Sequence, residues 1–413
     1  MLTTGRRHPW TTSISNGPPG TSLGELATRN ASIVAAEEAF LAPGVPRTAL
    51  NFRVEAVRRV CQRAGIPISA IDGVAVSVSA DLRPGQMPAL ELANELGLSP
   101  SFIDSTLAGG VSPVIQVARA ARALNDGACT VAVVAYGSVQ ASTRLRRKDG
   151  WRASSGILAD EMLVSTGWRN PISAHALIAA RHMHDYGTTA EDLATVAVSQ
   201  RMWAAMNPAA HRREQLTVQE VLDSPIVSWP LHVLDCCLIT DGGGAVLMCR
   251  REDVDSSLSP PISILGFDEL HTHQSLLTAA SLTVSGAART GARAMERAGL
   301  ATSDIDVVQL YDAFTDMPII LLEDLGFCAK GDGGKVFRSG RTQPGGDLPV
   351  NTQGGGLSHC HPGMYGIYLV IEAVSQLQGR AGPRQQGDVA HVLCHGVGGG
   401  AFGSHATLVL GRS

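Results

Sequence analysis

Four short segments hold reactive side chains in apolar or glycine-rich surroundings, and three of them lie in the C-terminal quarter. One is Tyr311-Asp312-Ala313-Phe314, directly after an expected strand. Another runs from Asn351 to Gly366 (NTQGGGLSHCHPGMYG), and a third from Cys394 to Gly400. The fourth is the turn Gly109-Gly110-Val111-Ser112. Phenol, imidazole and thiol groups can each move a proton, so these segments predict an enzyme that uses general acid–base chemistry.

The side chains in these segments have different expected roles. Tyr311, His361 and Cys394 are the catalytic candidates. A cysteine at a strand end is often simply a buried apolar side chain, so Cys394 stays open between the two interpretations. Asp312 is expected to brace its loop, and Tyr365 to form a wall of the pocket.

A repeated phrase indicates which elements position these segments. Residues 62–65 (QRAG) lead to 71–74 (IDGV), and residues 296–299 (ERAG) lead to 305–308 (IDVV), an offset of 296 − 62 = 234. In both copies the pattern predicts a helix that ends at glycine, the usual left-handed cap residue, and then an apolar strand.

The repeat continues in the same order. A helix over 114–125 precedes a strand over 129–135, and a helix over 364–377 precedes a strand over 389–394. Alternating helices and apolar strands predict a duplicated α/β domain. The expected halves are residues 1–260, with a lid loop at about 138–230, and residues 261–413. The first fifty residues are expected to form loop with one short helix.

Pseudo-twofold packing of two such halves would bring two glycine-rich loops together. Each loop, at 107–110 and at 358–363, runs into a mostly apolar helix. Free backbone N–H groups at helix N-termini favour negative charge, so Gly110 and Ser112 are expected to border an oxyanion pocket. Gly396 belongs to the same pocket, and His395 either lines it or only orients the glycine loop.

The composition excludes several classes of protein. The 413 residues carry a net charge of −4 and few aromatic residues, unlike a basic nucleic-acid-binding protein. The eight cysteines form no CxxC pair, so a zinc or other metal site is not expected. The N-terminal residues have no apolar core typical of a signal peptide, and no apolar run is long enough to span a bilayer. A cytoplasmic protein with reduced thiols is therefore expected.

Several long phrases resemble the thiolase superfamily, in particular its sterol carrier protein-type or lipid-transfer-protein thiolase-like branch and the related non-thiolytic enzymes. They are LDCC with a following DG (234–237 and 241–242), LYDAFT, LEDLGFCAKGDGG, NTQGGGLSHCHPGMYG and CHGVGGG. The resemblance covers most of the chain from about residue 60. It implies a five-layered α-β-α-β-α fold with pseudo-twofold halves and a lid insertion in the first half, which agrees with the repeat.

The resemblance also implies roles for the four segments. Gly110 stands where a thiolase has its nucleophilic cysteine, with Ser112 as the matching serine, and the closest cysteine, Cys129, lies on the following strand. His361-Pro362 resembles the Gly-His-Pro loop, Cys394-His395-Gly396 the Cys-x-Gly loop, and residues 311–314 the His-Asp-Cys-Phe loop. A glycine cannot carry an acyl group, so an acyl-enzyme at that position is excluded.

These substitutions favour making or breaking a carbon–carbon bond in an acyl-CoA thioester without a cysteine acyl-enzyme. The leading hypothesis is an aldol or retro-aldol lyase on a β-hydroxyacyl-CoA, as in the steroid side-chain aldolases of this superfamily. Those aldolases carry a second tyrosine near the position of His361, where this chain keeps His-Pro. The alternatives are an acyltransferase that uses Cys360 or Cys394, and a non-catalytic acyl-CoA-binding subunit.

The resemblance further implies the molecules with which the chain works. Coenzyme A, as part of the substrate, is the only cofactor expected, and a role in lipid or steroid metabolism follows. A homodimer is expected, as is a separately encoded OB-fold protein with a zinc ribbon. The basic run at 144–148 is either a solvated loop or a docking site for the CoA phosphates, formed by Arg144, Arg146, Arg147 and Lys148.

Overall fold

The structure, a computed structural model, describes residues 31–78, 85–146, 165–168, 171–250, 260–399 and 401–412. The elements up to residue 250 are β1 (Ala31–Glu38), α1 (Ala49–Ala64), β2 (Gly73–Ser77), α2 (Pro88–Leu96), β3 (Phe102–Thr106), α3 (Ser112–Asn125), β4 (Val131–Ser138), α4 (Gln140–Arg146), α6 (Ile172–Tyr186), α7 (Ala190–Ala205), α8 (Val218–Asp223), β5 (Ile226–Ser228), β6 (Leu231–His232) and β7 (Gly242–Arg250). The later elements are β8 (Ile262–His271), α9 (Ala287–Ala298), β9 (Val307–Leu310), α10 (Asp316–Asp324), α11 (Gly333–Arg338), α12 (Gly366–Leu377), β10 (His391–Gly398) and β11 (Ser404–Arg412).

The main strands form one mixed sheet with the order β3-β2-β4-β7-β1-β8-β11-β10-β9. The order on one side of the β1–β8 pair mirrors the order on the other, with β2, β4 and β7 in the places of β9, β10 and β11. This mirrored order confirms the predicted duplicated α/β fold. The division of the chain near residue 260 stays a prediction.

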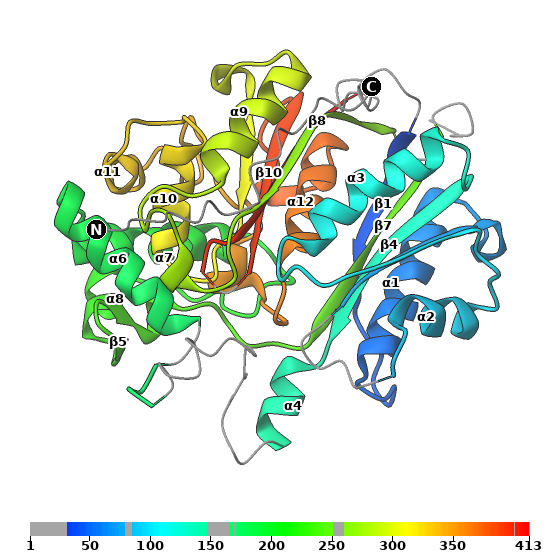
Figure 1. The fold of residues 1–413 in the computed structure, drawn as a ribbon, viewed down its shortest axis with the longest axis horizontal. Coiled ribbons are helices and arrows are strands. Elements are labelled where there is room, and N and C mark those ends of the chain that lie inside the picture. The colour runs from blue at the N-terminus through cyan, green and yellow to red at the C-terminus, as the bar shows by residue number, and fades with distance from the viewer. Residues whose placement is uncertain are drawn as a thin grey trace, which may run out of the picture.

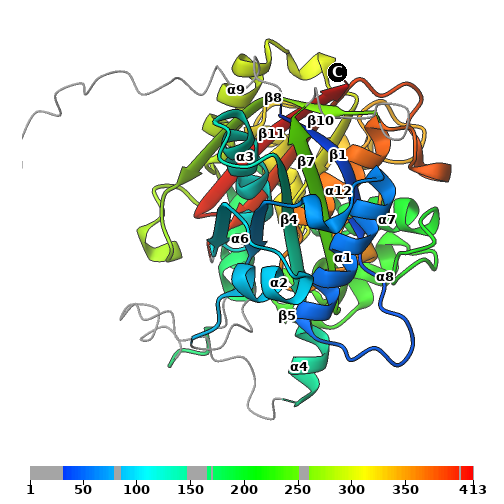
Figure 2. The ribbon, with the colours of Figure 1, turned by 90° about the vertical axis from the view of Figure 1, so that its right-hand side faces the viewer.

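Helices pack on both faces of each half of the sheet. α3 and α12 lie in the middle of the molecule, between the strands of the two halves, while α1 and α2 cover one outer face and α9 and α10 the other (Figure 1). The view turned by 90° shows α1 and α2 in front of β4, β7 and β1 (Figure 2). The α-β-α-β-α layering therefore has the two central helices as its inner layer.

Residues at equivalent positions have the same structural role in the two halves. Gly65 and Gly299 end α1 and α9 in the left-handed region, each with φ of 67°. The Asp72 carboxylate accepts the N–H groups of residues 130 and 131, just before β4. The Asp306 carboxylate accepts those of residues 390 and 391, just before β10. The repeated sequence thus encodes a repeated helix cap and a repeated strand anchor.

For residues 31–50 the expectation of loop and one short helix was wrong, while residues 1–30 lie outside the described part of the chain. Residues 31–38 form β1, which pairs with both β7 and β8 and joins the two halves of the sheet. This segment (ASIVAAEE) contains three alanines and two glutamates, residues that are depleted in strands. Its strand conformation depends on the two strands that flank it, because the segment alone has little preference for that conformation.

The connection between β4 and β7 carries α4, α6, α7, α8 and a two-stranded hairpin of β5 and β6. Two of its helices pack against elements of the second half, α7 against α11 and α6 against α10. The residues that follow the hairpin then run along the loops that carry the candidate catalytic side chains, before the chain returns to the first half in β7. This insertion therefore connects the two halves around the candidate site.

Candidate active site

Tyr311 and His361 meet at the N-terminal end of the two central helices. Tyr311 follows β9, and its backbone N–H donates to the His395 carbonyl at 3.0 Å. Its phenol oxygen lies 3.0 Å from Nε2 of His361, and the two rings meet edge to face. The two residues keep 6% and 7% of their surface exposed, while most residues around them keep almost none. Both side chains are therefore buried, with a small part of their surface left open to solvent.

The loop of His361 is held by residues of the first half. The His361 N–H donates to the Thr240 hydroxyl at 3.1 Å, and the Thr240 N–H donates to the His361 carbonyl at 3.3 Å. The Tyr136 hydroxyl donates to the Pro362 carbonyl. Thr240 and Tyr136 were not among the residues expected at the site, because neither stands in a motif with an obvious chemical role.

Gly110 faces the Tyr311 ring directly. A Cβ atom added at Gly110 would lie closer than 3.0 Å to Cε2, Cζ and Oη of Tyr311. The phenol of Tyr311 thus fills the space into which a side chain at residue 110 would project. Cys129 precedes β4 and does not lie on that strand as expected, and its sulfur packs against Gly73.

The N-termini of α3 and α12 meet next to this pair. A Cβ atom added at Gly366, the first residue of α12, would collide with the Gly110 carbonyl oxygen. The Ser112 hydroxyl closes the preceding loop: it accepts the Ala108 N–H and donates to the Gly109 carbonyl, both at 2.8 Å. Two helix N-termini beside the Tyr311 hydroxyl favour negative charge that develops there.

Burial keeps both reacting side chains neutral. Loss of solvent lowers the pKa of His361 to about 4. Loss of solvent also raises the pKa of Tyr311 well above its usual value, with a further rise from Cys237 and an opposing contribution from the Tyr365 N–H. In the tautomer of His361 that has its proton on Nδ1, the neutral phenol donates its proton to Nε2. The pair can pass a proton between them without forming a charge in its resting state.

Asp312 and Tyr365 lie behind the pair. The Asp312 carboxylate accepts the Gly356 N–H at 2.6 Å, and burial raises its pKa to about 8. The Tyr365 ring stacks on the His361 ring, with centroids 6.2 Å apart and an angle of 12°. Tyr365 is fully buried, and its hydroxyl has no hydrogen-bond partner among the described residues. It therefore supports His361 from behind.

The residues of the Cys-x-Gly segment alternate between the two faces of β10. The Cys394 thiol points to α12, 3.5 Å from the Leu369 carbonyl oxygen, and burial raises its pKa. Gly396 lets α3 approach, because an added Cβ would lie 3.1 Å from the α-carbon of Val111. His395 points the other way and contacts the Thr407 hydroxyl at 2.8 Å and Nδ1 of His405 at 3.1 Å. The structure thus places neither the Cys394 thiol nor the His395 imidazole in hydrogen-bond contact with the Tyr311–His361 pair. His395 contacts the pair through its backbone carbonyl, which accepts the Tyr311 N–H.

Two other groups named from the sequence lie elsewhere. Cys360 is buried beside His359, and burial raises the pKa of the Cys360 thiol. Nε2 of His359 lies 2.9 Å from the Glu38 carboxylate. In the basic run, Arg144 and Arg146 belong to α4 but their side chains lie outside the described part of the structure, as do Arg147 and Lys148 altogether. The role of this run in binding CoA stays a prediction.

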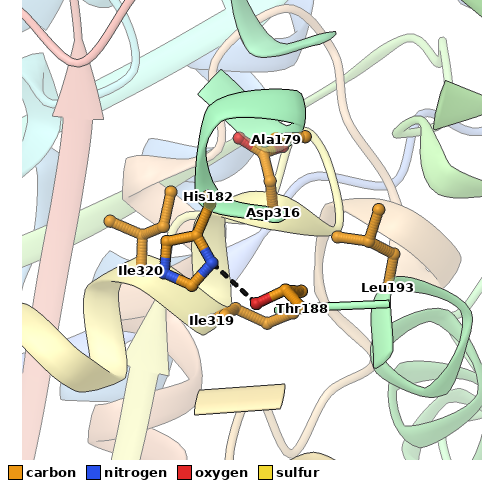
Figure 3. Close-up of a pocket in the computed structure, with 7 residues that line it drawn as sticks. All are labelled: Ala179, His182, Thr188, Leu193, Asp316, Ile319 and Ile320. Carbon is orange, nitrogen blue, oxygen red and sulfur yellow. Dashed lines mark hydrogen bonds between the residues drawn. The ribbon is translucent and has the colours of Figure 1, made fainter. Parts of the chain in front are cut away.

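A small enclosed space lies between α6, α7 and α10 (Figure 3). It is too narrow for a water molecule and is lined by Ala179, His182, Thr188, Leu193, Asp316, Ile319 and Ile320. The His182 imidazole is already engaged by Thr188 at 2.8 Å and by Glu323 at 2.9 Å. This space is a gap in packing, separate from Tyr311 and His361.

Within the described ranges, no group of three or more His, Cys, Asp or Glu residues is placed to hold a metal, and no helix is long and apolar enough to cross a membrane.

The chain is similar to proteins of one superfamily. The family "Thiolase C-terminal domain-like" matches residues 268–412. The chain is 32% identical to the steroid side-chain-cleaving aldolase of Thermomonospora curvata, over 84% of this chain and 90% of that protein. It is 38% identical to an acetyl-CoA acetyltransferase of Methanothermobacter thermautotrophicus, a match that spans 55% of this chain and 60% of that protein. The solved structure of the "Ltp2-ChsH2(DUF35) aldolase" has a TM-score of 0.79 and 29% identity, and the match covers 93% of this chain and 98% of that one.

The contact between Gly110 and Tyr311 predicts a strong coupling between the two positions. Gly110→Ala should lower the free energy of unfolding by about 1–3 kcal/mol, because the added methyl group overlaps the phenol ring. Tyr311→Ala should remove that penalty, so that the double variant is no less stable than Tyr311→Ala alone. Chemical denaturation of the four proteins measures the coupling. Additive effects of the two substitutions would show that the ring does not occupy this space.

Burial of His361 predicts a stability that falls with acidification. The pKa of His361 is lowered to about 4, so between about pH 6.5 and 4 the unfolded chain binds a proton that the folded protein does not. Stability should therefore be full above pH 6.5 and fall by up to about 3 kcal/mol toward pH 4 through this group alone. His361→Gln should reduce the slope of unfolding free energy against pH in this window. Equal slopes for the two proteins would contradict a buried, neutral His361.

Proposed function

This chain belongs to the thiolase superfamily, in its sterol carrier protein-type thiolase-like branch, and on that premise we propose that it is an enzyme that breaks or makes a carbon–carbon bond in a CoA thioester without an acyl-enzyme. The proposed reaction is the retro-aldol cleavage of a β-hydroxyacyl-CoA, or its reverse. CoA enters as part of the substrate, and no further cofactor is proposed.

One observation carries this proposal: the Tyr311 phenol fills the space in front of Gly110 and is hydrogen-bonded to His361. Thiolysis needs a nucleophile at that place, and here a proton donor and its acceptor stand there. Retro-aldol cleavage needs a base for the β-hydroxyl proton and an acid for the α-carbon, and it needs no covalent intermediate. The residues present match the second set of requirements.

The proposed reaction moves one proton through the pair. The β-hydroxyl proton passes to the Tyr311 oxygen as the phenol proton moves to Nε2 of His361. The electrons of the Cα–Cβ bond pass to the thioester carbonyl, so the β-carbon becomes a ketone and the acyl-CoA leaves as an enolate. Backbone N–H groups at the ends of α3 and α12 stabilise the enolate oxygen. The proton then returns through Tyr311 to the α-carbon, and both side chains recover their starting state.

The name of the Thermomonospora relative points to a substrate class. Removing a steroid side chain by a retro-aldol step requires the β-hydroxyl on the ring carbon that bears the side chain. We therefore propose a CoA thioester of that kind, which yields a ketosteroid and a shorter acyl-CoA. We also propose a separate OB-fold partner with a zinc ribbon, because the similar solved structure is named as a complex with a DUF35 protein.

Acyl transfer of the thiolase kind is a second candidate, favoured by the 38% identity to an acetyl-CoA acetyltransferase. It would have to use Cys360 or Cys394 as the nucleophile. Burial raises the pKa of both thiols, which disfavours the thiolate that attack requires. Lyase chemistry therefore fits this site better.

We also propose that the protein is located in the cytoplasm, in keeping with its eight free thiols.

Tyr311→Phe should reduce the turnover of a steroid CoA thioester of this kind by about 100-fold or more, because the phenyl ring keeps its packing but cannot carry a proton. The KM should change little. Product formation is measured by mass spectrometry, with and without a DUF35-type partner, which should raise turnover. Tyr186→Phe, at a partly exposed tyrosine on α6, is the control.

Two other results would argue against the lyase. A stoichiometric acyl adduct on Cys360 or Cys394 after incubation with labelled acyl-CoA, together with unchanged turnover in Tyr311→Phe, would favour the acyltransferase. Failure of the wild-type protein to cleave the thioester in the presence of the partner would refute the lyase.

We also propose a homodimer that forms through β3. This strand ends the sheet within the described ranges, so one edge of its backbone is unpaired, and Ile103 and Leu107 are 45% and 66% exposed there.

Ile103→Lys should shift the protein to a monomer in light scattering, because it places a charge in the proposed interface. Leu177→Lys, at an equally exposed leucine on α6, should not. An unchanged mass in both variants would argue against this interface.

A further inference from the structure

Asp312 connects the two loops that carry the reacting side chains. It follows Tyr311 in the chain, and its Oδ1 accepts the Gly356 N–H from the turn that leads to His361, at 2.6 Å. A Cβ atom added at Gly356 would lie 3.1 Å from the Asp312 carbonyl oxygen, 3.1 Å from its Oδ1 and 3.1 Å from Cδ2 of His361. Asp312 and His361 are therefore neighbours across a single glycine. A shift of the Asp312 carboxyl would move both partners of the Tyr311–His361 hydrogen bond.

The turn at 354–359 is built to receive this carboxyl. Gly355 has φ of 62°, and a Cβ atom there would collide with Oδ2 of Asp312. Asn351 fixes the other side, because its amide donates to the Leu310 carbonyl at 2.9 Å and accepts the Leu310 N–H at 2.6 Å. A side chain at Gly355 would overlap the Asp312 carboxyl, and one at Gly356 would meet Asp312 and His361 in tight contact.

The surroundings of the carboxyl offer no positive charge. Asp312 is fully buried, and its Oδ2 has no hydrogen-bond partner among the described residues. The titratable groups that act on it or beside it are Tyr311, Tyr365 and Cys237, which are neutral or would become negative, and the neutral His361. Within the described part of the chain, no Lys, Arg or His is paired with it, unlike Asp316, which has His175. A carboxylate at this place would be an uncompensated buried charge.

We propose that Asp312 is a positioning residue that works as an uncharged carboxylic acid and fixes the distance between Tyr311 and His361. This inference rests on the proposed lyase function for its kinetic consequences only. Burial raises the pKa of Asp312 to about 8, and the N–H groups of Gly356 and Leu357 and the Asn351 amide lower it only in part. The group is therefore neutral at pH 7. Above about pH 8 it ionises next to the pair and disrupts it.

The kinetic test compares Asp312→Asn with Asp312→Ala. The asparagine keeps an oxygen for the Gly356 N–H and a neutral group, so kcat at pH 7 should fall by less than about 5-fold, and the loss of activity near pH 8 should disappear. The alanine removes the connection, and kcat should fall by about 100-fold with little change in KM, as a misplaced reacting group does. Asp316→Asn, at another buried aspartate, should leave the pH profile unchanged. Loss of turnover at all pH values in a folded Asp312→Asn protein would overturn the proposal.

A second measurement does not depend on activity. Between about pH 4 and 8 the folded protein holds a proton on Asp312 that the unfolded chain has released, so this group makes the wild type less stable as pH rises. The stability of Asp312→Asn relative to the wild type should therefore increase with pH across this window, with a slope equivalent to one proton. A difference that is constant with pH would overturn the neutral acid. If the wild type cleaves no thioester but this slope is observed, the lyase proposal fails and the assignment of Asp312 stands.

Discussion

The hydrogen bond between the Tyr311 phenol and the His361 imidazole exists only because residue 110 has no side chain. The ring needs the volume that any Cβ at that position would take, and the loop before α3 is closed by Ser112 so tightly that it cannot retreat. The same close packing continues outward: Gly366 admits the Gly110 carbonyl, and Gly396 admits the first turn of α3. The glycines of this region are thus one connected constraint, and the Tyr311 phenol occupies the space inside it.

This constraint has an electrostatic counterpart. The pair is almost closed to solvent, so both groups are neutral at rest, and the nearby helix N-termini supply a local field that favours negative charge. Such a place stabilises a negative charge that appears during a reaction more than one that is present beforehand. An enolate that forms and is then protonated meets this condition. A resting thiolate does not, and burial raises the pKa of both nearby thiols.

The parts of the structure that could be predicted from sequence are those with local causes. The helix ends at Gly65 and Gly299 follow from backbone conformation, and the repeat that contains them gives the duplicated fold. β1 could not be predicted, because its conformation comes from β7 and β8 on either side. Tyr311 and His361 could be named as candidates from their side chains. Their contact joins residues fifty positions apart and depends on Thr240 and Tyr136, which belong to the other half. The side chains of Cys394 and His395 point in opposite directions because side chains alternate along a strand, so this difference could have been predicted from the sequence.

The insertion between β4 and β7 explains how a site shared by two halves keeps its geometry. After the β5–β6 hairpin the chain follows the second-half loops closely: Asp235 accepts the Thr315 hydroxyl at 2.9 Å, the Cys237 N–H donates to the Ala313 carbonyl at 2.8 Å, and Thr240 holds His361. These bonds fix the segments on both sides of Tyr311 and His361 from a single stretch of the first half. Tyr311 and His361 come from the second half, the space that the phenol occupies lies in front of Gly110, and the insertion holds the loop of His361. Residue 110 contributes only its backbone to this framework, so the framework is complete without a side chain there.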